Sequence, residues 1–160
     1  MIDTRVTQLL DASGISYRIL PHNEPVFTVT AAAEQRGVDV EEMVKSILLR
    51  DKGRRYVMAC VSGNERLDPK ALRAHLDGDW KRLSFASAEE IRQVTGYVQG
   101  AVAPLSLSQE IPIVFDQAIA HHARVNISSG DPMAGLELNP DDLIKLSGAQ
   151  LADIIEKSSR

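Results

Sequence analysis

Residues 46–62, SILLRDKGRRYVMACVS, contain two apolar runs that are separated by a short turn. The runs are Ser46–Asp51 and Arg54–Ser62, and a Lys-Gly pair lies in the connection between them. Nearly continuous apolar runs are typical of strands that are buried on both faces. The stretch therefore predicts a β-hairpin with largely buried strands, and Lys45 stands where a preceding helical turn gives way to the first strand.

Signals for helices and strands alternate on both sides of this hairpin. Before it we expect a helix from Asp3 to Gly14, a strand over Ile15–Leu20, a short helix from Thr30 to Gly37, and a turn begun by Asp39-x-x-Glu42. After it we expect a helix from Asp68-Pro69, a strand over Trp80–Phe85, a helix from Ser87 to about Val94, strands over Ile111–Phe115, Arg124–Ile127 and Leu136–Leu138, and helices over Asn139–Leu146 and Gly148–Lys157. The interleaving predicts an α+β (mixed α/β) fold with a single central mixed β-sheet that is flanked by helices.

Composition limits the class of protein. A chain of 160 residues that is 44% hydrophobic and 25% charged is expected to form a single domain over residues 1–160. No apolar run approaches the roughly 20 residues of a bilayer span, and MIDTRVTQLLDASG has no signal-peptide core, so we expect a cytoplasmic protein with no membrane partner. Cys60 has no second cysteine to pair with and is expected to be a buried structural thiol.

The charge pattern gives two interpretations of one basic cluster. A net charge of −4 argues against indiscriminate coating of nucleic acid, and no DNA partner is expected. Five cations nevertheless fall within eleven residues: Lys45, Arg50, Lys52, Arg54 and Arg55. They could form a strip that faces a nucleic acid, or simply the solvated face of a hairpin.

Motifs for several kinds of chemistry are missing from the sequence. The four histidines lack zinc-site spacing, and the chain contains neither HExxH nor paired CxxC, so we expect no metal and no other cofactor. It also contains neither GxSxG nor a phosphate-binding GxxxxGK[ST] loop. An activated protein nucleophile is therefore not indicated.

The stretch 95–104, TGYVQGAVAP, has no charged residue and is bounded by glycines and a proline. Glycine lets the backbone approach a ligand, proline stiffens the exit of a loop, and successive N–H groups can bind an oxyanion. Gly96 and Gly100 could also merely permit turns, and Lys45 could be an ordinary lysine at a helix end. Neither signal is specific when it is taken alone.

Four ordered blocks make the pattern more specific. VKSILLRDKG, SGNERLDPKAL, TGYVQGAVAPLSL and NISSGDPMAGLELNPDDLIKL, in this order, resemble the YbaK/ProRS-associated domain family of aminoacyl-tRNA deacylases. The resemblance implies a free-standing trans-editing hydrolase, similar to the insertion domain of prolyl-tRNA synthetase. Such enzymes hydrolyse the ester of a mischarged tRNA, commonly tRNA for proline that carries alanine or cysteine. The implied partners are the aminoacyl-tRNA 3′ end and either prolyl-tRNA synthetase or an elongation factor.

The resemblance also implies a set of site residues. The essential lysine of the family falls on Lys45, and its Gly-x-x-x-Pro loop falls on Gly100, Ala101 and Pro104. The substrate-lining candidates are Ser128, Ser129 and Gly130, with His22, Phe27, Thr28 and Met58 as further walls of the pocket. We expect backbone groups of residues 100–103 to hold the ester carbonyl or the water, and Lys45 to contact a phosphate or the ribose of the 3′ adenosine. No metal and no covalent intermediate is expected.

One departure from the family pattern affects the substrate. Gly130-Asp131-Pro132-Met133-Ala134-Gly135 replaces a basic Gly-Lys/Arg-Arg-Gly turn that is common in relatives, so the amino acid removed is left open. A non-catalytic module that binds a nucleotide or the tRNA 3′ end, or a protein that acts only as a synthetase partner, are the alternatives to an enzyme.

Overall fold

The computed structural model describes residues 2–157. The elements in chain order are α1 (Arg5–Ala12), β1 (Tyr17–Pro21), α2 (Val29–Arg36), the 3-10 helix η1 (Val40–Glu42), β2 (Val44–Asp51), β3 (Tyr56–Ser62), α3 (Pro69–Ala74), β4 (Leu83–Phe85), α4 (Ala88–Thr95), β5 (Ile113–Asp116), the 3-10 helix η2 (Gln117–His121), β6 (Val125–Ser128), β7 (Ala134–Leu138), α5 (Pro140–Ser147) and β8 (Gln150–Ala152). Within these residues no helix is both long and apolar enough to cross a membrane.

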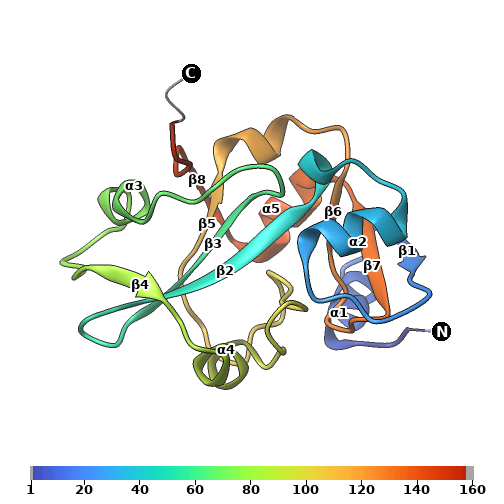
Figure 1. Cartoon of the computed structure of the whole chain (residues 1–160), viewed down its shortest axis with the longest axis horizontal. Helices are drawn as coiled ribbons and strands as arrows, with labels where there is room; N and C mark the ends of the chain where they lie inside the picture. The colour runs from blue at the N-terminus through green and yellow to red at the C-terminus, as the bar shows by residue number, and fades with distance from the viewer. Residues whose placement is uncertain (1, 158–160) are drawn as a thin grey trace.

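The strands form two sheets, as Figure 1 shows. The larger sheet has the order β4-β2-β3-β5-β8 and is mixed, because β3–β5 and β5–β8 are parallel pairs whereas β2 pairs antiparallel with β3 and β4. The smaller sheet, β1-β7-β6, is antiparallel. The mixed α/β class with flanking helices is confirmed, but the expectation of one sheet is corrected: β6 pairs with β7, and only an isolated Met43–Asn126 bridge joins it to the segment before β2.

The hairpin of residues 46–62 is present, with β2 and β3 in register from Val44–Ser62 to Arg50–Tyr56. Six of the seven residues of β3 are buried, as their apolar run predicts. In Figure 1, β2 starts beside α2 and the smaller sheet and ends beside β4. The two ends of this strand therefore lie in different surroundings.

Most helix ends follow from capping chemistry. Asp68, Ser87 and Asn139 cap α3, α4 and α5 as the sequence predicts, whereas Thr4 and Thr28 cap α1 and α2 in place of the expected Asp3 and Thr30. Thr4 and Thr28 are the N-cap residues because each side chain accepts a hydrogen bond from the backbone N–H three residues further along the chain.

The expected helix over Gly148–Lys157 is wrong. Residues 150–152 form β8, which pairs parallel with β5, and the N–H of Ile154 donates to the Asp116 carboxylate at 3.1 Å. The open edge of β5 supplies backbone partners to this segment, and that tertiary pairing outweighs a helical apolar spacing.

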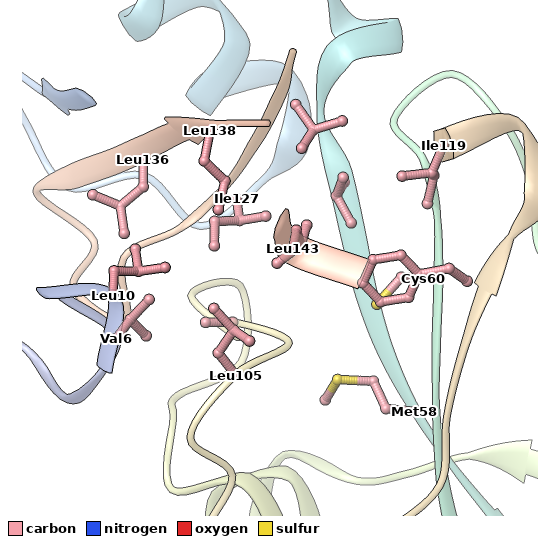
Figure 2. Close-up of a cluster of buried hydrophobic side chains, with 14 of the residues drawn as sticks. Val6, Leu10, Met58, Cys60, Leu105, Ile119, Ile127, Leu136, Leu138 and Leu143 are labelled. Carbon is pink, nitrogen blue, oxygen red and sulfur yellow. The ribbon is translucent and has the colours of Figure 1, made fainter. Parts of the chain in front are cut away.

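The main core joins the two sheets, as Figure 2 shows. Val6 and Leu10 of α1 pack with Ile127, Leu136 and Leu138 of the smaller sheet and with β3. The β3 residues Met58 and Cys60 are fully buried here. Met58 is thus a core residue and not a pocket wall, and burial raises the pKa of the Cys60 thiol to about 12, as befits a structural cysteine.

Candidate functional site

A cavity of about 210 Å³ lies between the start of β2, the N-terminal half of the chain around α2, the Gly100 turn and the β6–β7 loop. Its walls are formed by His22, Val26, Phe27, Thr28, Val29, Ala32, Arg36, Met43, Val44, Lys45, Ser46, Ile47, Gly100, Ala101, Val102, Ser128, Asp131 and Pro132. Pockets for drug-sized ligands measure roughly 300–1,000 Å³. This cavity suits a smaller group.

The larger sheet leaves one strand edge open beside the cavity. β4 pairs only with Leu49–Asp51 of β2, so the edge of the first half of β2 is left without a neighbouring strand from the larger sheet. Residues 44–47, from that half, line the cavity. The short length of β4 therefore makes room for the site.

Lys45 is the second residue of β2, and its ammonium group donates to the carbonyl of Glu65 in the loop after β3. Burial and the neighbouring charge of Arg66 lower the pKa of Lys45, and Glu65 partly opposes this shift. A lysine side chain carries three N–H donors. The Glu65 contact thus fixes the side chain and leaves donors for a ligand in the cavity.

Gly100 lies in a turn in which the N–H of Ala101 donates to the carbonyl of Val98 at 3.0 Å. Its φ of +88° is what the third position of a type II turn requires. A Cβ on Gly100 would also lie 2.8 Å from the Cα of Phe27, which leaves no space for a side chain. Glycine is needed here for both reasons.

The same turn determines which backbone donors are available. The turn uses the N–H of Ala101, whereas no acceptor in residues 2–157 takes the N–H of Gly100 or Val102. Both residues line the cavity. The backbone donors left for a ligand are therefore those of Gly100 and Val102, in place of Ala101, and their binding of an anion stays a prediction.

Tyr97 joins the two ends of the loop formed by residues 97–105. Its side chain is buried, and its hydroxyl donates to the carbonyl of Leu105 at 2.5 Å. Pro104 is buried next to that contact and does not line the cavity. Pro104 can stiffen the loop but lies outside the cavity wall.

The two predicted serines, Ser128 and Ser129, make different contacts in the β6–β7 connection. Ser128 lines the cavity, and its hydroxyl accepts the N–H of Gly130 at 3.0 Å. Ser129 is fully buried and donates to the carbonyl of Ala134 at 2.7 Å, so it closes the loop. Gly130 packs on Tyr97 behind the loop, where a Cβ would lie 2.9 Å from the Tyr97 ring.

The structure thus brings seven of the predicted site residues to one cavity: His22, Phe27, Thr28, Lys45, Gly100, Ala101 and Ser128. Phe27 is 54% exposed, and the Thr28 hydroxyl caps α2. Four predicted residues lie elsewhere: Met58, Pro104, Ser129 and Gly130. Lys45 and Gly100, the two residues on which the predicted chemistry depends most, thus line the same cavity.

Sequence reasoning missed Arg36, which also lines the cavity. Its Nε donates to Nε2 of His22 at 3.1 Å, while the His22 Nδ1 lies 2.8 Å from the Pro132 carbonyl. A carbonyl can only accept and the Arg36 Nε can only donate, so these contacts fix a neutral His22 with its proton on Nδ1. The sequence did contain a signal for Arg36: the spacing of Val29, Ala32 and Arg36 places an arginine on an apolar face of the predicted helix.

Burial shifts the pKa of both partners. It lowers the pKa of Arg36 to about 10. It also lowers the pKa of His22, where the Pro132 contact opposes the shift and the Arg36 charge adds to it.

In residues 2–157 no three metal-binding side chains of His, Cys, Asp or Glu gather at one point. The cavity therefore offers cations and backbone donors for a small anionic or ester group.

Comparisons with known proteins agree with this chemistry. The family model for the aminoacyl-tRNA editing domain matches residues 23–146. The chain is 29% identical to the prolyl-tRNA editing protein ProX of Acetoanaerobium sticklandii over 86% of this chain and 85% of the relative. It is 30% identical to the multifunctional Ser/Thr-tRNA deacylase ProXp-y of Escherichia coli over 70% and 67%, respectively. A crystal structure of a proposed trans-editing enzyme for prolyl tRNA synthetase superposes with a TM-score of 0.82 at 26% identity, over 98% of this chain and 100% of that one.

Proposed function

The chain belongs to the family of aminoacyl-tRNA editing domains, and we propose that it is a deacylase. Its reaction is hydrolysis of the ester of a mischarged aminoacyl-tRNA. The observation that carries the proposal is the cavity shared by Lys45 and the Gly100 turn. The names of ProX and ProXp-y, an editing protein and a deacylase, support the same activity.

The reaction needs few groups because an aminoacyl ester is already reactive. Water attacks the carbonyl carbon, and the open N–H groups of Gly100 and Val102 stabilise the negative charge that develops on the carbonyl oxygen. The ribose oxygen leaves with a proton, and the products are the free amino acid and the tRNA. A tRNA hydroxyl near the ester assists in activating the water.

Lys45 places the substrate. Its ammonium group is held by Glu65 and lies at the cavity wall, where it binds a phosphate or the ribose of the 3′ adenosine. A desolvated contact of this kind orients the ester against the Gly100 turn. The lysine is needed for placement and not as a nucleophile.

Selection by size follows from the small cavity. Val26, Val29 and Ala32 line one side of it, and its volume of about 210 Å³ limits the aminoacyl group that can enter. Editing sites accept side chains smaller than the cognate one and reject larger ones by shape. We propose tRNA for proline carrying a small noncognate residue as the substrate, with alanine, cysteine and serine as the candidates.

The test is deacylation by the purified protein of tRNA charged with alanine, cysteine or serine. We expect release of the free amino acid at a rate that rises with enzyme concentration. A protein that slows the tRNA in a gel without releasing amino acid from any of the three would be a binding module, and the proposal would be wrong.

A further inference from the structure

Arg36 is a half-buried cation that forms no ion pair within residues 2–157. The ion pairs within residues 2–157 involve Arg18, Arg50, Lys81, Arg124, Lys157 and Arg55, and none of them involves Arg36. Its surroundings remove enough water to lower its pKa, and a charge that has lost part of its hydration is normally paired. The guanidinium group of Arg36 therefore requires another explanation.

The protein uses only part of the hydrogen-bonding capacity of this group. A guanidinium has five N–H donors. One donates to His22 at 3.1 Å and one makes a weak contact with the Met43 sulfur at 3.7 Å, so that three remain without an acceptor in residues 2–157. Asp131, the acid on the cavity wall, instead accepts the N–H of Met133 at 2.8 Å.

The surroundings hold the guanidinium in position. Gly135 of β7 lies directly against it, since a Cβ on Gly135 would overlap the guanidinium atoms. His22, fixed by Pro132, accepts a hydrogen bond from the Arg36 Nε–H. Arg36 is thus preorganised before any ligand arrives.

A second polar group nearby also lacks partners. Both polar side-chain atoms of Asn126 are buried and have no hydrogen bond in the described part of the chain. Asn126 lies two residues before Ser128 on the same face of β6, and its backbone bridges to Met43. Unsatisfied buried polar groups are rare, and Asn126 does not itself line the cavity.

From these observations we propose that Arg36 is a specificity-determining residue which recognises a hydroxyl group on the side chain of the aminoacyl ester. The proposal rests on the proposed deacylase function and refines its substrate: between side chains of similar size the one with a hydroxyl is preferred, so seryl esters are preferred to alanyl esters and threonyl esters to valyl esters. The walls beside Arg36 are the apolar side chains of Val26, Ala32 and Met43. A methyl group there displaces water and leaves charged N–H donors unpaired, whereas a hydroxyl oxygen accepts from them.

The experiment compares four esters of one tRNA, charged with serine, alanine, threonine or valine. Threonine and valine have the same shape, so their ratio reports the hydroxyl alone. For the unmodified protein we expect kcat/KM to be about tenfold higher for serine than for alanine and for threonine than for valine. Equal rates within each pair would overturn the proposal while leaving the deacylase function intact.

Variants then assign the preference to Arg36. Arg36→Met should reduce both ratios to near one, and Arg36→Lys, which keeps a cation, should retain part of them. Arg18→Met is the matched control, because Arg18 is an arginine of the smaller sheet whose exposed side chain pairs with Glu137 away from the cavity wall. If Arg36→Met slows all four esters equally, Arg36 binds a group common to them, such as a phosphate, and the proposal is wrong.

Binding gives a readout that does not depend on turnover or on the stability of a variant. The probes are 3′-amino-3′-deoxyadenosine bearing serine or alanine in a non-hydrolysable amide, titrated against the unmodified protein. We expect about tenfold tighter binding of the seryl amide. Equal affinities would contradict the role of Arg36, and failure of every charged tRNA to be hydrolysed would instead contradict the proposed function on which it rests.

Discussion

Charged side chains at the two ends of β2 differ in how far the protein satisfies their hydrogen-bonding groups. At its start, Lys45 and the nearby Arg36 have more donors than the protein uses, and both line the cavity. At its end, Asp51 is 1% exposed and accepts the N–H groups of Arg55 at 2.8 Å and Lys81 at 3.0 Å. The start of β2 thus holds Lys45, with Arg36 of α2 on the same cavity, as cations with unused donors, whereas its end holds a carboxylate whose acceptors are used.

The far end of β2 also accounts for part of the basic cluster. Arg50 pairs with Glu90 at 3.1 Å, and Arg55 pairs with Asp51 at 3.6 Å and stacks on Trp80 at 4.1 Å. These arginines have partners within the protein. The interpretation of the cluster as a structural, solvated hairpin face therefore suits Arg50 and Arg55 better than a role in binding nucleic acid.

The difference between the two ends of β2 indicates where a ligand binds. Paired charges stabilise the fold, whereas charges held in position with donors to spare are available for substrate. If this is correct, substitutions at the start of β2 should change activity with little change in stability. Substitutions at its end should do the reverse.

The largest effect is expected for Lys45→Ala. Loss of a desolvated charged contact in the transition state should reduce kcat/KM by roughly 30- to 1,000-fold, or about 2–4 kcal/mol, in a tRNA deacylation assay. The free energy of unfolding in urea should change little, because Lys45 forms no ion pair within residues 2–157. Lys52→Ala, at the exposed turn of the same hairpin, is the control and should keep full activity. Hydrolysis by Lys45→Ala at the parent rate would remove the lysine from the mechanism.

The next effect is expected for Asp51→Ala, on stability. The substitution leaves two backbone N–H groups without their acceptor and should lower the free energy of unfolding by about 2–3 kcal/mol. Asp51→Asn keeps an acceptor oxygen and should lose less. Deacylation at a temperature where both variants are folded should match the parent; a large loss of kcat/KM would show that the ends of β2 are not independent.

Gly100→Ala should have an intermediate effect on activity. The φ of +88° and the contact with the Phe27 backbone both oppose a side chain, so the turn must shift and carry the Gly100 and Val102 donors with it. We expect kcat/KM to fall about tenfold. Gly14→Ala is the matched control: Gly14 has a φ of +69° but open space around it, and the variant should lose some stability and no activity.

Sequence patterns predicted the elements that local chemistry determines. The buried hairpin and the caps at Asp68, Ser87 and Asn139 needed only apolar runs and capping residues. The strand β8 could not be predicted in this way, because its conformation depends on the distant edge of β5. The division into two sheets likewise depends on which strand β6 meets in space.

The candidate site was predictable to a similar extent. The ordered blocks placed Lys45, Gly100 and Ser128, and all three line the cavity. They could not separate Ser128 from its neighbour Ser129, because the direction of each side chain depends on the closure of the β6–β7 loop. Arg36 was missed because its significance comes from a partner that is absent, which is a property of the folded molecule.

A smaller effect should follow acidification at the far end of β2. The N–H of Ser87 and then the hydroxyl of Tyr56 lower the pKa of Glu90 to about 2. A carboxylate with a lowered pKa contributes stability above its unfolded value of about 4.5, and this is lost as the pH falls toward 2. Because Glu90 is partly exposed, we expect only about 1 kcal/mol. Urea unfolding of Glu90→Gln should show a flatter pH dependence in this window; an unchanged slope would exclude Glu90 as its source.

The smallest effect concerns His22 at the cavity, where the pKa is again lowered but the form that is favoured is the neutral one. Burial lowers the pKa of His22, with Asp131 and the Pro132 carbonyl opposing the shift and Arg36 adding to it. Stability from the neutral form is therefore complete above pH 6.5 and declines as the pH falls from 6.5 through the lowered pKa. An NMR titration of the His22 ring should give a pKa below 6.5. In Arg36→Met the value should rise, because the substitution removes a neighbouring cation, whereas Arg18→Met should leave it unchanged. If the His22 pKa were the same in Arg36→Met as in the parent, the guanidinium group would not act on the imidazole. The interaction between His22 and Arg36 on the cavity wall would then be excluded.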